Sequence, residues 1–235
     1  MARLLIFDTS GGACSVAVWS GGGLAAERFE AMAHGQAERL LPMIGEALAA
    51  AGIGYGELDA VGVTRGPGAF TGIRVGLAAA RGLALALDIP AIGIATFEAL
   101  AVRAPAGCVV AIDTRRDDFY CQRFGPDGAA RDAPEILPAA GAAARAGAAG
   151  VPLVTDSAAL AAGADREPAD PPPAPPRAAE FAALVAGRHD SLGESGRTGL
   201  PPPRPLYLRP PKAQLPEARQ PEARQGERRR GAPRR

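Results

Sequence analysis

One local pattern occurs twice in this chain, and it constrains the fold more than any other feature of the sequence. A short apolar run ends in Asp8-Thr9 near the start, and another ends in Asp113-Thr114 further along. Each run is followed by a turn and by a second apolar stretch, over 14–19 in the first case and 118–124 in the second. Two such runs joined by a turn are typical of a β-hairpin. The repetition predicts two similarly folded halves.

Between the two hairpins the apolar pattern changes repeatedly between the strand period and the helix period. Apolar residues at helical spacing predict helices over 35–51 and 71–87, and the second helix is apolar nearly all round. Short apolar runs predict strands over 24–30, 58–63 and 91–95. This alternation predicts an α/β fold in which helices pack on a mixed sheet.

The second half has fewer regular elements and more proline. Of the 23 prolines, 15 lie from Pro168 onward. Three elements are predicted here, a short strand, an extended proline-rich stretch and a short helix, over 151–155, 165–177 and 178–187. The predicted organisation is a large N-terminal unit, a smaller C-terminal unit and a tail, with the bounds 1–103, 104–211 and 212–235.

Charge separates the tail from the rest of the chain. The net charge is only +1, but residues 212–235 carry eight basic and three acidic side chains, which gives +5. Residues 1–211 carry 18 basic and 22 acidic side chains, which gives −4. This composition predicts a disordered basic arm on a weakly acidic body. It excludes a strongly basic nucleic-acid-binding surface along the whole chain.

Cysteine usage and hydropathy narrow the class of protein further. The three cysteines contain no Cys-x-x-Cys pair, which argues against a disulfide framework or a structural zinc site. The apolar run before Asp8 is shorter than a secretory signal requires, and no uninterrupted apolar run of about 18 residues is present to span a membrane. We therefore expect a cytoplasmic protein.

Two turns carry residues that could hold phosphate groups. The stretch 66–72 joins a predicted strand to a predicted helix, and N–H groups at a helix start can bind an anion. Its GxGxxxG spacing is one residue longer than the dinucleotide-binding motif, and it lacks the Gly-Lys-Ser/Thr of a P-loop. Alternatively, these residues only form and cap tight turns. The candidate phosphate-binding residues are Asp8, Thr9, Ser10, Gly66, Gly68 and Thr71.

The sequence predicts no metal site and no catalytic residue. His34 and Glu38 have the spacing of a metal-binding pair, but a catalytic zinc needs about three protein ligands and no HExxH motif is present. A serine triad lacks the GxSxG elbow. Cys108 and Cys121 lie among apolar strand residues and are expected to pack in the core.

In combination, several motifs resemble the TsaB (YeaZ) family. The most specific is GPGAFTGIRVG over 66–76. The other matching motifs are Leu5-Ile6-Phe7-Asp8-Thr9-Ser10, His34 with Leu40-Leu41-Pro42, Asp113-Thr114-Arg115-Arg116 with Tyr120, and Pro205-Leu206-Tyr207-Leu208-Arg209-Pro210. The resemblance covers 1–125 and returns at 205–212.

This resemblance implies a fold and a function. The fold would be the actin/hexokinase/Hsp70-like (ribonuclease H-like) duplicated α/β fold, with the second half reduced. The function would be a non-catalytic part in forming N6-threonylcarbamoyladenosine at adenosine 37 of tRNAs that read codons starting with A. TsaB-like proteins work with TsaD, which carries the transferase chemistry, and with TsaE. The tRNA would be bound indirectly, through that complex.

One departure from TsaD supports this division of labour. TsaD-like proteins hold a metal with a His-x-x-x-His pair, and the corresponding positions here are Thr96 and Leu100. A leucine side chain has no donor atom with which to bind a metal. Glu98, between them, matches the TsaD pattern but cannot hold a metal alone. We therefore expect no metal and no catalysis by this chain.

The resemblance also implies that the two N-terminal helices contact TsaD and, in isolation, a second copy of the chain. A helix that is apolar nearly all round leaves uncovered apolar surface in a monomer, and such surface usually marks a partner. The predicted interface residues are Leu40, Ile44, Leu48, Ile73, Gly76, Ala79, Ala80 and Leu83. No firmly bound cofactor is expected, and ATP or ADP would bind only at a subunit interface.

Two alternatives from other classes stay open. One is an active ATPase or kinase of the same superfold, in which Asp8 would serve one phosphate loop. Against it, Asp113 is followed by Thr114-Arg115-Arg116 rather than by a glycine-rich turn. The other is a free-standing RNA-binding protein that uses the tail 212–235, against which the acidic body argues.

Overall fold

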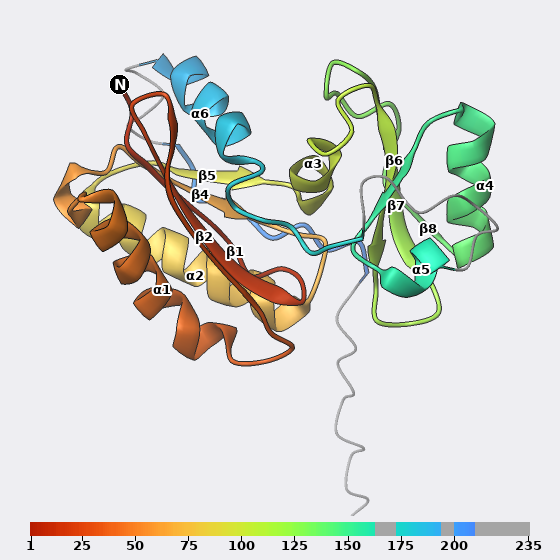
Figure 1. The fold of residues 1–235 in the computed structure, drawn as a ribbon, viewed down its shortest axis with the longest axis horizontal. Coiled ribbons are helices and arrows are strands. Elements are labelled where there is room, and N and C mark those ends of the chain that lie inside the picture. Colours follow the sequence, from red (N-terminus) through yellow and green to blue (C-terminus); the bar gives the residue numbers. More distant parts are fainter. Residues whose placement is uncertain (163–172, 194–199, 210–235) are drawn as a thin grey trace, which may run out of the picture.

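The computed structural model describes residues 1–162, 173–193 and 200–209. It contains two β-sheets that lie beside each other, each with helices packed against it (Figure 1). This arrangement confirms the predicted duplicated α/β fold with a reduced second half. The predicted tail, 212–235, and the first part of the predicted proline-rich stretch lie outside the described residues.

The first sheet has five strands in the order β3-β2-β1-β4-β5. β2 pairs antiparallel with both β1 and β3, β4 runs parallel to β1, and β5 runs parallel to β4. Each strand matches one that the sequence predicts. Their bounds are β1 Leu4–Asp8, β2 Ala13–Ser20, β3 Gly23–Ala31, β4 Ala60–Thr64 and β5 Ala91–Ile94.

Helices cover both faces of the first sheet. The helices α1 (Gln36–Ala51) and α2 (Phe70–Leu87) pack on one face, where Leu5 and Phe7 of β1 contribute to the core. Because side chains alternate along a strand, the neighbouring residues Leu4 and Ile6 face the other side, where they pack against α6 (Ala182–Ser191). A short 3-10 turn, η1 (Tyr55–Glu57), links α1 to β4.

The second sheet repeats this plan with one strand fewer. Its order is β8-β7-β6-β9, and its central strand β6 pairs antiparallel with β7 and parallel with β9, as β1 pairs with β2 and β4. Its strands are β6 Cys108–Asp113, β7 Phe119–Phe124, β8 Glu135–Leu137 and β9 Leu153–Thr155, and the helices α4 Ala139–Ala149 and α5 Ala158–Ala162 pack beside them. β1 and β6 both end in aspartate, so the repeated sequence pattern corresponds to a repeated structure.

The two halves exchange helices, which corrects the predicted boundary between 1–103 and 104–211. Phe97 and Leu100 of α3 (Thr96–Ala101) pack in the core of the second sheet. Phe181 and Val185, from the predicted smaller unit, pack on the first sheet with α6. Both helices lie near a point where the chain passes from one half to the other, and each buries its apolar side chains on the sheet that it meets in space (Figure 1).

Candidate functional site

The polar residues at the end of β1 lie inside the protein. Asp8 is fully buried, and its Oδ1 accepts hydrogen bonds from Ser10 N at 3.2 Å, from Ser10 Oγ at 2.6 Å and from Thr64 Oγ. Its other oxygen, Oδ2, has no partner among the described residues. Burial raises the pKa of Asp8, although the hydrogen bonds from Ser10 and Thr64 oppose this shift. This carboxyl group therefore braces the turn and does not face solvent.

The turn after β1 is packed directly on the loop that opens α2. Thr9 Oγ donates to the carbonyl oxygen of Gly72 at 2.7 Å, and Ala69 N donates to the carbonyl oxygen of Ser10 at 2.8 Å. A side chain at Gly72 would overlap the carbonyl oxygen of Thr9, and one at Gly68 would overlap that of Ser10. These glycines are therefore required by the close approach of two backbones.

The candidate phosphate-binding residues lie close together, but four of the six are buried. Asp8, Thr9 and Ser10 are at most 2% exposed, and Gly66 is buried as well. Thr71 is exposed, and Gly68 is half-buried. The turn and the loop contact each other where a phosphate loop would leave an open space, so the binding of a nucleotide at these six residues stays a prediction.

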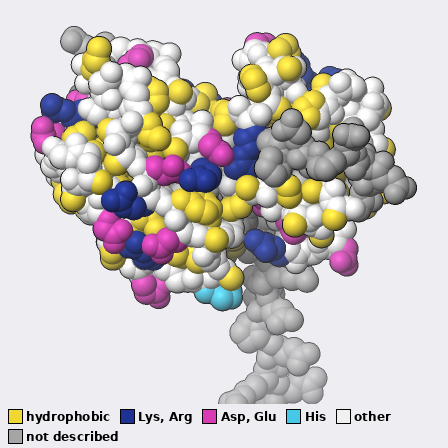
Figure 2. Space-filling view, in the orientation of Figure 1, with side chains coloured by type: hydrophobic (Ala, Val, Ile, Leu, Met, Phe, Trp, Pro, Cys, Tyr) yellow, Lys and Arg dark blue, Asp and Glu magenta, His cyan; other side chains and the backbone are white. Residues whose placement is uncertain are grey.

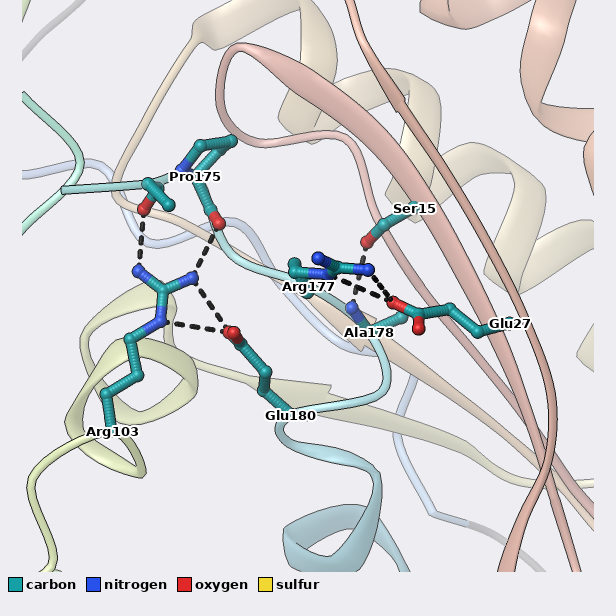
Figure 3. Close-up of polar contacts among 8 residues, drawn as sticks. Ser15, Glu27, Arg103, Pro175, Arg177, Ala178 and Glu180 are labelled. Carbon is teal, nitrogen blue, oxygen red and sulfur yellow. Dashed lines mark hydrogen bonds and ion pairs between the residues drawn. The ribbon is translucent and has the colours of Figure 1, made fainter. Parts of the chain in front are cut away.

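A crossing segment, residues 173–180, runs from the second half back to the first (Figure 3). The guanidinium group of Arg103 donates to the carbonyl oxygens of Ala174 and Pro175, both at 2.7 Å, and pairs with Glu180. Pro175 packs on the turn after β1, where its Cβ would lie 3.3 Å from a side chain at Gly11. The sequence reasoning missed Arg103, since no motif surrounds it.

Further along, the crossing segment is attached to the first hairpin (Figure 3). Arg177 pairs with Glu27 of β3 at 2.9 Å, and its guanidinium carbon lies 4.6 Å from the centre of the Phe29 ring. Ala178 N donates to Ser15 Oγ of β2 at 2.9 Å. Ser15 therefore provides the hydrogen-bond acceptor for a backbone N–H of the crossing segment. Through these contacts the segment joins the two halves next to the turn after β1.

A cleft of about 400 Å³ separates the two halves on the side of the α2 loop. We call it the inter-half cleft. It is lined by Pro67, Gly68, Ala69 and Phe70 from the first half, by Asp113, Thr114, Arg115, Arg116 and Tyr120 from the second, and by Leu206, Tyr207, Leu208 and Arg209. The last four residues belong to the family motif at 205–210. The structure brings this motif beside two others, those at 66–76 and 113–116, which are far away along the chain.

Turn residues after β6 are open to this cleft, unlike those after β1. Asp113 is only half-buried, and its Oδ1 accepts from Arg115 N at 2.7 Å. Arg115 has φ +59°, in the left-handed region that favours glycine. Asp118 pairs with Arg209, and this hydrogen bond holds the pKa of Asp118 below its usual value.

Asp156, after β9, supports this turn from within. Its Oδ1 accepts from the backbone N–H of Asp113 at 2.8 Å. Burial raises the pKa of Asp156 to about 6, although the hydrogen bond from Asp113 N opposes the shift. Asp156 therefore links β9 to the end of β6, as Thr64 links β4 to the end of β1.

The predicted interface residues lie mostly in the core of this chain, which corrects their assignment. Six of the eight are buried on the first sheet or in the packing of α1 on α2, namely Leu40, Ile44, Leu48, Ile73, Gly76 and Ala80. Ala79 and Leu83 are half-buried. Helical spacing identified the apolar face of each helix correctly, but that face meets the sheet.

The solvent-facing side of α1 and α2 carries a different set of apolar and small residues. Leu85 is 86% exposed and Leu41 is 55% exposed. Ala49, Ala78, Gly82 and Ala86 are exposed as well. We call these six residues the outer helix face. Figure 2 shows charged side chains beside apolar ones in the region of α1, where Arg39 pairs with Glu30 and Glu46.

α2 is long and apolar enough to cross a membrane, judged by its length and composition alone. It also carries Arg74 and Arg81, and its buried side packs on β4 and α1. Soluble core helices meet the same criteria. We therefore interpret α2 as a layer of the α/β fold.

The residues at the positions of the TsaD metal pair lie inside the protein. Leu100 is fully buried in the core of the second half, and the Thr96 hydroxyl lies 3.3 Å from Ser10 Oγ. Glu98 caps its own helix by accepting from Ala95 N at 2.8 Å, and it pairs with Arg188. Within the described ranges, no group of three or more His, Cys, Asp or Glu side chains could hold a metal ion.

The cysteines and histidines form no second site in the described structure. All three cysteines are free and buried, and burial raises the pKa of Cys14 to about 12 and of Cys108 and Cys121 to about 11. Their thiols are therefore core groups, as the sequence predicts for Cys108 and Cys121. His34 is exposed, whereas His189 is buried in α6.

A family model and two curated proteins match this region of the chain. Residues 30–154 match the family described as "TsaD: tRNA N6-adenosine threonylcarbamoyltransferase". The "tRNA threonylcarbamoyladenosine biosynthesis protein TsaB" of Escherichia coli is 36% identical over 130 residues, which is 53% of this chain and 56% of that protein. The Haemophilus influenzae protein of the same name is 42% identical over 123 residues, 50% of this chain and 51% of that protein. The chain thus spans about half the length of these curated relatives.

Among solved structures, an uncharacterized Pseudomonas aeruginosa protein "with similarity to peptidase YEAZ" matches with a TM-score of 0.74 and 31% identity. The match covers 89% of this chain and all of the other. Two similar halves, each with an aspartate at the end of its central strand, define a protein of the actin/hexokinase/Hsp70-like class. Within that class, the chain belongs to the TsaB (YeaZ) family.

Proposed function

We propose that this chain is a non-catalytic subunit in the formation of N6-threonylcarbamoyladenosine on tRNA. Membership of the TsaB family is the observation that carries the proposal. In this role the chain supports a TsaD-type transferase, which does the chemistry at adenosine 37, and it acts together with a TsaE-like protein. The chain works in the cytoplasm, where tRNA is modified.

The polar chemistry of the chain supports the non-catalytic part of the proposal. The positions of the TsaD metal pair hold Thr96 and Leu100, both buried. In the competing reading, an ATPase or kinase, Asp8 would act on a phosphate or on Mg²⁺. Its burial and the packing of Pro175 on Gly11 argue against that role. ATP or ADP, where bound, lies at the interface with the partner.

The outer helix face is the surface that we assign to the partner. Leu85 and Leu41 are large apolar side chains that a monomer leaves in water, at a cost that burial against a partner would remove. Ala78 and Gly82 of α2 are exposed as well. Because alanine carries only a methyl group and glycine has no side chain, another helix can approach α2 closely there. The same surface would pair two copies of the chain in isolation.

Reconstitution tests the function. TsaD, TsaE, the enzyme that makes threonylcarbamoyl-adenylate, ATP and tRNA are combined with and without this chain, and modified adenosine is measured by mass spectrometry. We expect modification to depend on the chain. Equal modification in its absence would contradict the proposed function.

A matched pair of variants tests the surface. Leu85→Glu places a charge in the outer helix face, and we expect at least a tenfold loss of co-purified TsaD, since a charge cannot be buried without a partner. The control is Leu24→Glu on β3, which is 48% exposed and lies outside that face. Equal loss in both variants, with both folded by circular dichroism, would argue against this surface.

A further inference from the structure

We propose that the inter-half cleft binds unpaired nucleotides of an RNA strand. In this model, Arg115 and Arg116 contact phosphate groups, while Phe70 and Tyr207 stack on bases. The proposal rests on the proposed function to the extent that the RNA is tRNA. It assigns to this chain a direct contact with the substrate, where the sequence predicted only an indirect one.

The first argument is charge. Arg115 and Arg116 lie exposed on the turn after β6, and neither guanidinium group pairs with a carboxylate within the described part of the chain. Arg209, in the same cleft, is already neutralised by Asp118. The cleft therefore presents two guanidinium groups without a direct ion pair, with the carboxylate of Asp113 beside them in the lining, on a body whose residues 1–211 sum to −4. Phosphate groups are the partners that such charges attract.

The second argument is the backbone of Arg115. A non-glycine residue at φ +59° is strained, because its Cβ crowds the backbone carbonyl oxygen. The hydrogen bond from Arg115 N to Asp113 Oδ1 holds this conformation, and Asp156 in turn holds Asp113. The side chain of Arg115 is exposed, so its own packing does not impose this conformation. Strain kept at an exposed turn points to a functional role for the side chain that it orients.

The third argument is a set of aromatic rings at the rim of the cleft. The ring centres of Phe70 and Tyr207 are 5.3 Å apart, and both residues are more than a third exposed. Arg74 covers the Phe70 ring at 3.7 Å and donates from Nε to the Tyr207 hydroxyl oxygen at 3.2 Å. Proteins that bind single-stranded nucleic acid combine such rings with nearby positive charge.

The shape favours a strand over a free nucleotide. Pockets for small molecules bury most of the ligand surface. Here the rings stand at the rim of a cleft of about 400 Å³ and stay exposed to solvent. A strand that enters the cleft and continues over the rim would cover both the arginines and the rings.

The test measures binding of fluorescently labelled tRNA by anisotropy, at several salt concentrations, with the full chain in its complex with TsaD. The test variant is Arg115→Gly with Arg116→Ala, in which glycine suits the backbone at position 115. We expect at least tenfold weaker binding. With about 0.7 per phosphate contact on a single strand, the slope of log K against log salt should become shallower by about 1.4.

A control with the same change in charge keeps this result specific. Arg123→Ala with Arg131→Ala removes two exposed arginines of the second half that do not line the cleft. We expect its affinity for tRNA to stay within twofold of the unmodified protein. A loss equal to that of the test variant would mean that the effect is nonspecific, and would overturn the proposal.

A second pair of variants separates stacking from charge. Tyr207→Ala removes the ring, and we expect about fivefold or greater weakening of tRNA binding. Tyr207→Phe keeps the ring and loses only the hydrogen bond from Arg74, so we expect binding within twofold of the unmodified protein. Equal behaviour of the two variants would contradict stacking.

Other outcomes overturn the proposal as well. Unchanged tRNA affinity in the variant Arg115→Gly with Arg116→Ala would overturn it. So would binding of free AMP or ATP by the unmodified protein that is lost in this variant and kept in the control variant. Loss of TsaD co-purification would instead mark the cleft as a protein-docking surface. The titration is repeated on the chain alone, so that a failure of the proposed complex is distinguished from a failure of the RNA contact.

Discussion

Each half of this protein has an Asp-Thr pair at the end of its central strand, β1 in the first half and β6 in the second, but the two pairs lie in opposite environments. In the first half, Asp8 and Thr9 are buried, and the loop that opens α2 lies on top of them. In the second half, Asp113 and Thr114 are half-buried and line the inter-half cleft.

The residues that follow the pair account for the difference. Ser10 and the two glycines after it have small side chains, so another backbone can pack directly on the turn. Arg115 and Arg116 carry charges that cannot be buried without partners, so the second turn stays in solvent. The first turn is therefore a packing element, and the second turn is the one available to a ligand.

The largest expected effect comes from a substitution that separates the turn after β1 from the loop that opens α2. A methyl group in Gly72→Ala would overlap the carbonyl oxygen of Thr9, so we expect a loss of more than about 4 kcal/mol in unfolding free energy. Gly82→Ala in the same helix is the control, because its side chain would meet nothing within 4 Å, and it should stabilise the helix by up to about 1 kcal/mol. Urea denaturation measures both, and similar values would refute the packing role.

Removing each aspartate compares the two turns directly. Asp8→Ala leaves Ser10 and Thr64 donors unsatisfied inside the protein, and we expect a loss of about 3 kcal/mol. Asp113→Ala removes a half-exposed acceptor and should cost about 1 kcal/mol. Thermal and denaturant unfolding of the two variants provide the measurement. An equal cost would contradict the proposed contrast between a buried and an open turn.

The pH dependence of stability tests the support beneath the second turn. The pKa of Asp156 in the folded protein is about 6, above the unfolded value near 3.9. The folded state therefore retains this proton at a pH where the unfolded state has lost it, so stability falls as the pH rises from about 4 to about 6. Asp156→Asn should remove about 2 kcal/mol of this fall.

The effect of Asp156 is the difference in unfolding free energy between the unmodified protein and the variant at each pH. A difference is needed because the raised pKa of Asp8 also lowers the stability as the pH rises. Stability is measured from pH 4 to pH 8 in the unmodified protein and in the variant. Asn keeps an oxygen that can accept from Asp113 N, so the turn itself is preserved. Parallel pH profiles would show that Asp156 is not the group responsible.

The smallest effect concerns the attachment of the crossing segment to the first half. Arg177→Ala removes the ion pair with Glu27 and the contact with the Phe29 ring. Both groups are partly exposed, so we expect a loss of about 1 kcal/mol. Hydrogen exchange should rise locally at Ala178 N, which is bonded to Ser15. A loss above about 3 kcal/mol would mean that the segment carries more of the fold than we infer.

Sequence patterns predicted most elements of the fold, because a regular period is a local property, but they missed the short strand β8 and the helices α3, α4 and α5. The helix predicted over 35–51 is α1, and the repeated run before Asp8 and Asp113 identifies both central strands. The same patterns were insufficient for the interface. Leu40, Ile44 and Leu48 lie on one helix face, as their spacing predicts, but periodicity does not say whether such a face meets a sheet or a partner.

The sequence specified most of the strands, the two long helices of the first half, the two related halves and the family, since these depend on period, turn residues and short motifs. Other features came only from the folded chain, including the exchange of α3 and α6 between the sheets and the closing of the first turn. The meeting of Phe70, Arg115 and Tyr207 in one cleft is another such feature. Each depends on contacts between residues far apart along the chain, and the packing of whole elements decides which of these contacts form.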